Sequence, residues 1–140
     1  MSADYEVFAT SIILSGGEQM AAEFLVWDSD PADTDQVKLA LKFAGKQIVV
    51  SDDDYVAVLR KIRLQLEQDH ILLNCYGASR NAHVSPMSSD MGAGWKAYRL
   101  KLGEQAKIAS LVSIFETGAD VDPVTVAEQD AFFEAWKQTL

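Results

Sequence analysis

Residues 37–73 decide the fold, and they have the sequence VKLALKFAGKQIVVSDDDYVAVLRKIRLQLEQDHILL. Apolar and polar residues alternate over 37–43, which is typical of a strand with one face in solvent. Residues 44–46, with a glycine at their centre, predict a turn into a second strand over 47–50. The stretch therefore begins with a β-hairpin.

Residues 51–54 predict the start of a helix. Ser51 can accept a hydrogen bond from a backbone N–H of the first turn, and the three aspartates after it favour the positive end of the helix dipole. Apolar residues then recur at steps of four, three and four, which predicts one buried stripe made of Tyr55, Leu59, Ile62 and Leu66. The helix is expected to end near 68–70, before a buried strand that begins at 71–73.

Two more strands are expected ahead of this stretch, over 5–14 and 19–27, because both ranges are rich in β-branched and aromatic residues. Ser15, Gly16 and Gly17 predict the tight turn between them. These two strands form a second hairpin.

The end of the chain adds another strand and another helix. Tyr98, Leu100 and Leu102 alternate with polar or small residues, which predicts a strand with one buried face. Residues 105–116 fit a short helix or a strand, and the sequence leaves both open. Thr125 and Glu128 have the spacing of a capping box. This capping box predicts the start of a last helix. The apolar face of that helix is expected to contain Phe132, Phe133, Trp136 and Leu140.

This order of elements predicts an α+β fold. We expect an antiparallel or mixed sheet of five to six strands, with two to three helices packed on one face. A chain of 140 residues has the usual size of one domain, so residues 1–140 are expected to form a single domain.

The composition indicates where in the cell the protein is expected. The single cysteine, Cys75, excludes an internal disulfide, and the first residues lack the basic start and apolar core of a secretory signal. No apolar run approaches the ~20 residues that a membrane-spanning helix requires. These features favour a cytoplasmic protein without a membrane partner.

Acidic residues are concentrated at the two ends of the chain. Residues 1–37 hold eight acids and no Lys or Arg, and residues 116–140 hold six acids against Lys137 alone. An acidic surface repels nucleic acid phosphates and attracts a basic protein, so no nucleic acid partner is expected. The candidate contact residues are Asp28, Asp30, Asp33 and Asp35.

A second candidate site lies in the long connection over 77–94, because a connection of this length is often functional. It carries guanidinium and imidazole groups beside small polar residues, and the candidates in and after it are Arg80, His83, Ser85, Asp90 and Arg99. An arginine fork there could bind an anion. Alternatively, Arg80 ties the connection to its own acids.

Other chemistry finds little support in the residues. Residues 92–94 (Gly-Ala-Gly) precede a strand rather than a helix, which argues against a nucleotide site. Cys75 lies in an apolar run and is expected to be a core residue. His83 and Asp90 are too few for a metal site, so we expect neither a metal nor a cofactor.

The second half of the chain resembles a family of small bacterial proteins of unassigned function. The resemblance rests on GASRN at 77–81, on SPMSSDMGAGWKAYRL at 85–100 and on the late run VAEQDAFFEAW. It implies a bacterial cytoplasmic origin, and it offers no catalytic residue that could be transferred to this chain. In size and acidity the chain is also similar to toxin-immunity proteins, which cover the active site of a basic toxin.

Our leading hypothesis is therefore a non-enzymatic protein-binding module with an acidic surface, in its most concrete form an inhibitor of a bacterial toxin. The alternative is a small-molecule or anion-binding protein, in one version an enzyme, with its site in the 77–94 connection. A third hypothesis is a self-associating structural protein, a homo-oligomer.

Overall fold

The computed structural model describes residues 5–85 and 95–140. It begins with four strands, β1 (Tyr5–Ile13), β2 (Gln19–Trp27), β3 (Val37–Phe43) and β4 (Lys46–Asp52). Helix α1 (Tyr55–Glu67) follows, and then strand β5 (Leu72–Leu73), 3-10 turn η1 (Tyr76–Ala78) and strand β6 (Ala82–His83). The last elements are β7 (Lys96–Arg99), 3-10 turn η2 (Ile108–Ser110), β8 (Val112–Ser113) and α3 (Val126–Gln138).

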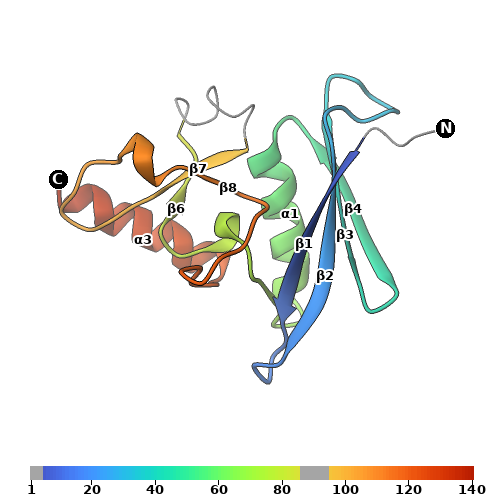
Figure 1. Cartoon of the computed structure of the whole chain (residues 1–140), viewed down its shortest axis with the longest axis horizontal. Coiled ribbons are helices and arrows are strands. Elements are labelled where there is room, and N and C mark those ends of the chain that lie inside the picture. Colours follow the sequence, from blue (N-terminus) through green and yellow to red (C-terminus); the bar gives the residue numbers. More distant parts are fainter. Residues whose placement is uncertain (1–4, 86–94) are drawn as a thin grey trace.

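The strands form two antiparallel sheets, one with the order β4-β3-β2-β1-β5 and one with the order β6-β7-β8. Helix α1 packs on the five-stranded sheet, whereas α3 and the second sheet lie at the other end of the long axis (Figure 1). The α+β class is confirmed. The expectation of one sheet with all its helices on one face was wrong, because β6, β7 and β8 pair only with one another among the described strands.

The two predicted hairpins are present, and they build the larger sheet. Every residue of β1 faces one of β2, from Tyr5 opposite Trp27 to Ile13 opposite Gln19. The turn between them places Gly17 at a φ of 87°, a backbone conformation that favours glycine. The inner face of this sheet contributes Phe24, Leu39 and other fully buried side chains to the main core.

Helix α1 buries the predicted stripe, since Tyr55, Leu59, Ile62 and Leu66 are all in the main core. Its predicted start was wrong. Ser51 is a strand residue opposite Lys38, because the ladder of β3 and β4 continues to Asp52. The helix begins only after Asp54, whose carboxylate accepts a hydrogen bond from the N–H of Ala57 at 2.8 Å.

Strand β7 lies between two groups of buried side chains. Ala97 packs into the main core, while Tyr98 and Leu100 pack with Trp136 of α3 in a second cluster. The prediction of one buried face was therefore wrong, because consecutive residues are buried on opposite sides of the strand. Leu102 lies beyond the strand and its exposed fraction is 54%.

The ambiguous range 105–116 contains both kinds of structure, the 3-10 turn η2 and the short strand β8. Phe115, just after β8, is fully buried. The capping box of α3 is confirmed: the Thr125 hydroxyl accepts from the N–H of Glu128, and the Glu128 carboxylate accepts from the N–H of Thr125. Leu140 was wrongly assigned to the buried face, because the helix ends at Gln138 and Leu140 is 57% exposed.

Candidate functional site

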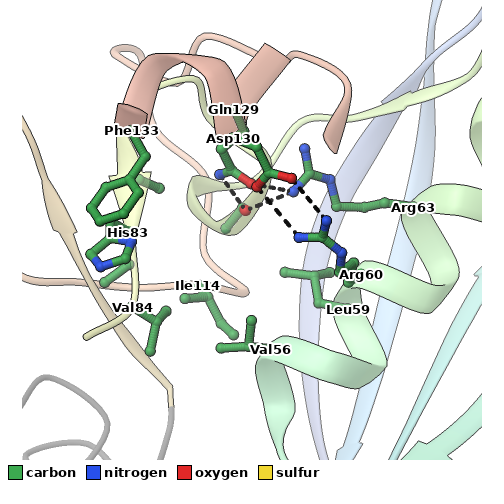
Figure 2. A pocket seen from close by; sticks show the side chains of 13 residues that line it. Val56, Leu59, Arg60, Arg63, His83, Val84, Ile114, Gln129, Asp130 and Phe133 are labelled. Carbon is green, nitrogen blue, oxygen red and sulfur yellow. Dashed lines mark hydrogen bonds and ion pairs between the residues drawn. The ribbon is translucent and has the colours of Figure 1, made fainter. Parts of the chain in front are cut away.

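A cavity of about 230 Å³ lies where α1, α3 and the second sheet meet (Figure 2). Its apolar wall includes Val56 and Leu59 of α1, Val84 after β6, and Ile114 after β8. The polar groups come from the two helices and from β6: Arg60, Arg63, Gln129, Asp130 and His83. Strands and helices that are far apart in the sequence thus supply one partly apolar, partly charged site.

Arg63 is the most unusual of these residues, because its side chain is only 5% exposed although it carries a charge. Its guanidinium donates to the Gln129 side-chain oxygen, to the Val124 carbonyl at 3.0 Å and to the Gly77 carbonyl at 3.4 Å. Burial lowers the pKa of Arg63, yet an arginine keeps its proton in proteins. Within residues 5–85 and 95–140, no carboxylate lies within ion-pair distance of it.

Gln129 holds the turn η1 against α3. Its side-chain nitrogen donates to the carbonyls of Gly77 and Ser79 at 3.0 and 2.8 Å, while its oxygen accepts from Arg63. Next to it, Asp130 accepts two hydrogen bonds from Arg60 at 2.8 and 3.4 Å, as the dashed lines in Figure 2 show. The bonds of Gln129 therefore tie η1 and α1 to α3, and the bonds between Arg60 and Asp130 tie α1 to α3 as well.

His83 closes the opposite side of the cavity. Its ring stacks on that of Phe133, with a centroid distance of 3.9 Å and an interplanar angle of 12°. Burial lowers the pKa of His83, and the positive charge of Lys137 lowers it further. The imidazole is therefore neutral at pH 7 in the folded protein.

This lowered pKa predicts a loss of stability in mild acid. The unfolded chain binds a proton near pH 6.5, above the pKa of His83 in the folded state, so the free energy of unfolding falls as the pH drops below that value. We expect urea melts at pH 7.5 and pH 5.5 to show a larger loss for the wild type than for His83→Gln. Lys137→Gln removes one cause of the shift and should give an intermediate loss. Equal losses in all three proteins would contradict the prediction.

The candidate residues of the 77–94 connection are placed separately. Arg80 forms an ion pair with Asp122 at 2.9 Å, and Arg99 forms one with Asp120 at 2.9 Å. Arg99 lines a different, polar cleft with Lys101 and Lys107. Neither arginine lines the cavity that contains His83.

The remaining candidates of the connection add little. Ser85 is half-buried two residues after the end of β6, and Asp90 lies outside the described residues. The second interpretation of Arg80 was that it pairs with an acid of its own connection. Arg80 does pair with an acid, but that acid is Asp122, near the start of α3.

Arg63 and Gln129 were missed by the sequence analysis. Arg63 follows Leu59 by four residues and Ile62 by one, so its position next to the apolar stripe of α1 was a usable signal. Gln129 gave no such signal, because a glutamine in a first helical turn is ordinary.

The four aspartates before β3 differ in their roles. Asp30 accepts hydrogen bonds from the Ser51 hydroxyl and from the N–H of Ala32, and these bonds hold its pKa below the usual range. Asp33 accepts from the N–H of Asp35 at 3.1 Å. Asp28 and Asp35 are exposed, and within the described residues their carboxylates accept no hydrogen bond. Asp30 and Asp33 therefore stabilise the conformation of the β2–β3 loop, whereas Asp28 and Asp35 remain available for a contact.

No protein family model matches this chain, and no curated protein sequence matches it. The resemblance of its second half to small bacterial proteins therefore stays a prediction.

Three further observations concern metal binding, membrane spanning and the reactivity of Cys75. Among residues 5–85 and 95–140, no three His, Cys, Asp or Glu side chains are grouped so that they could hold a metal ion. In the same part of the chain, the helices are too short or too polar to cross a bilayer. Cys75 is fully buried, and burial raises the pKa of its thiol to about 11, which leaves little thiolate at neutral pH.

Proposed function

We propose that this chain is a non-enzymatic protein-binding module that contacts its partner through one acidic end of the five-stranded sheet. We define the acidic end as seven aspartates of the β2–β3 loop and the β4–α1 junction: Asp28, Asp30, Asp33, Asp35, Asp52, Asp53 and Asp54. The hydrogen bond from Ser51 to Asp30 joins the two segments directly. This gathering of acids from separate segments is the observation that carries the proposal.

Nearby bases offset only part of this charge. Lys61 forms an ion pair with Asp52 at 2.8 Å, and Lys38 lies over the ring of Trp27 at 4.6 Å, close enough to Asp30 to lower its pKa. The remaining surplus is negative and exposed. Such a surface steers a basic protein toward it and increases the association rate.

A basic bacterial toxin is the most concrete partner that we propose, with the acidic end covering its active site. The support is the acidity of the chain, its net charge of −9, and its likeness in size to toxin-immunity proteins. The partner should be strongly basic at the contact, because Asp28, Asp35 and Asp53 are exposed there.

The test removes three aspartate charges whose carboxylates accept no hydrogen bond within the described residues. In Asp28→Asn/Asp35→Asn/Asp53→Asn, the loop keeps the bonds of Asp30 and Asp33 and the cap of Asp54. We expect the association rate with the captured partner, measured by stopped flow, to fall about three- to tenfold at low salt. We also expect high salt to slow the wild type more than this variant, because screening acts on surface charges.

A control variant with the same change in net charge separates local contact from overall charge. It replaces the exposed acids Glu18, Asp69 and Glu116 by their amides, away from the acidic end. An equal loss of rate in both variants, or a rate that does not respond to salt, would contradict the proposed surface. Turnover of a small substrate by the isolated protein would contradict the non-enzymatic part.

A further inference from the structure

We propose that the cavity between α1, α3 and the second sheet binds a compact apolar molecule with one carboxylate group. This site shares no residue with the acidic end, although both involve the first turn of α1, and its test is independent of the proposed protein partner. It contains His83 of the predicted anion-site residues, but its charge comes from Arg60 and Arg63 of α1.

The charges in the wall favour an anion. Two arginines and one carboxylate line the cavity, and the carboxylate of Asp130 is already bound by Arg60. Glu67, one turn along α1 from Arg63, accepts from the N–H of Val126 at 2.9 Å and helps to start α3. Among the described residues, the groups in direct contact with the Arg63 guanidinium are thus neutral oxygens, and the negative charges of Glu67 and Asp130 act on it from a distance.

A buried charge with neutral partners is a costly arrangement unless something compensates it. Two carbonyls and an amide oxygen meet part of this cost for Arg63. A ligand carboxylate at the cavity wall adds a negative charge in direct contact with the guanidinium. It would form a charge-assisted interaction, which is stronger than one between neutral groups.

The rest of the wall sets the size and polarity of the ligand. Val56, Leu59, Val84 and Ile114 offer an apolar surface, and the stacked rings of His83 and Phe133 offer a flat side (Figure 2). The volume of about 230 Å³ is below the ~300–1,000 Å³ typical of pockets for drug-sized ligands. A single ring or a short branched chain with one carboxylate fits this description.

A carboxylate suits the wall better than phosphate does. A planar carboxylate matches the fork of a guanidinium. Phosphate is strongly hydrated and has no apolar part, so the aliphatic wall would remove its water without offering contacts in return. The proposal therefore excludes inorganic phosphate as a good ligand.

The test uses benzoate as the probe, with benzamide as its neutral counterpart of the same shape and inorganic phosphate as a second anion. Each is titrated into the full chain and followed by amide chemical shifts in NMR spectra. We expect saturable binding of benzoate, with affinity at least about tenfold above that of benzamide or phosphate, the factor for losing a charge-assisted contact.

Two exposed apolar residues of α1 provide a matched pair of variants. Val56 lines the cavity and is 39% exposed, whereas Leu64 is 47% exposed and does not line it. Val56→Phe should fill the space and weaken benzoate binding at least about tenfold, and Leu64→Phe should leave it unchanged. The pair shares the helix and the inserted ring, so it separates occupancy of the cavity from a general effect on α1.

Arg63→Met tests the charge itself, and we expect it to reduce the preference for benzoate over benzamide to less than about threefold. If this variant does not fold, the comparison of benzoate with benzamide and the pair Val56→Phe and Leu64→Phe still decide the question. No saturable binding of benzoate, equal binding of benzamide, tighter binding of phosphate, or equal losses in the two α1 variants would each overturn the proposal.

Discussion

Replacing Trp136 with alanine is expected to lower the free energy of unfolding by about 3–5 kcal/mol. Trp136 is 9% exposed and packs with Tyr98 and Leu100 in the cluster that joins α3 to the second sheet. Its ring also stacks near Phe133, with centroids 5.8 Å apart. A small residue there leaves a cavity between α3 and the second sheet, because the other buried members of this cluster, Tyr98 and Leu100, belong to the β7 segment.

Urea melts of Trp136→Ala and of two further variants check this expectation. Trp136→Phe keeps a ring but loses the indole N–H that donates to the Glu104 carbonyl at 2.9 Å, so we expect a smaller loss. Leu140→Ala removes an exposed side chain from the same end of the chain and should change stability by less than about 0.5 kcal/mol. A loss below about 1 kcal/mol for Trp136→Ala would show that the ring is available to a partner instead.

The sequence predicts those parts of the fold that depend on neighbours along the chain. The hairpin of β1 and β2 follows from β-branched and aromatic residues and a glycine turn, that of β3 and β4 from alternation and a glycine turn, and the buried stripe of α1 from its spacing. The capping box of α3 is equally local. In each case the residues that make the pattern lie within one hairpin or one helix.

The division into two sheets depends on distant partners, and no local pattern indicates it. Strand β6 pairs with β7 through only two residues, Ala82 opposite Arg99 and His83 opposite Tyr98. Such a short ladder has no period that could be recognised. Burial of Ala97 and Tyr98 on opposite sides of β7 likewise requires two separate cores, which alternation cannot indicate.

The cavity was hidden from sequence analysis for the same reason. Arg63 bonds to Gln129, and Arg60 bonds to Asp130, across separations of 66 and 70 residues. A candidate site was predicted in the 77–94 connection, and one of its residues, His83, does line the cavity. Its two arginine candidates form ion pairs elsewhere, with Asp122 and Asp120.

Phe115 connects the end of β8 with the main core, although the range that contains it was the most ambiguous in the sequence. Its ring lies 5.3 Å from that of Phe24 and 5.6 Å from that of Phe8, which come from the five-stranded sheet. It also lies 5.6 Å from the ring of Trp95 and 6.0 Å from that of Tyr55. One side chain thus contacts both hairpin strands, α1 and the segment before β7.

Phe115→Ala is therefore expected to lower the free energy of unfolding by about 3–5 kcal/mol, toward the upper end because several aromatic contacts are lost at once. Phe115→Leu keeps most of the apolar volume, so we expect a clearly smaller loss. Phe132→Ala, a half-buried phenylalanine of α3, is the matched control and should cost less than Phe115→Ala. All three are measured by urea melts followed by circular dichroism. If Phe115→Ala costs no more than Phe132→Ala, the ring does not hold β8 to the main core.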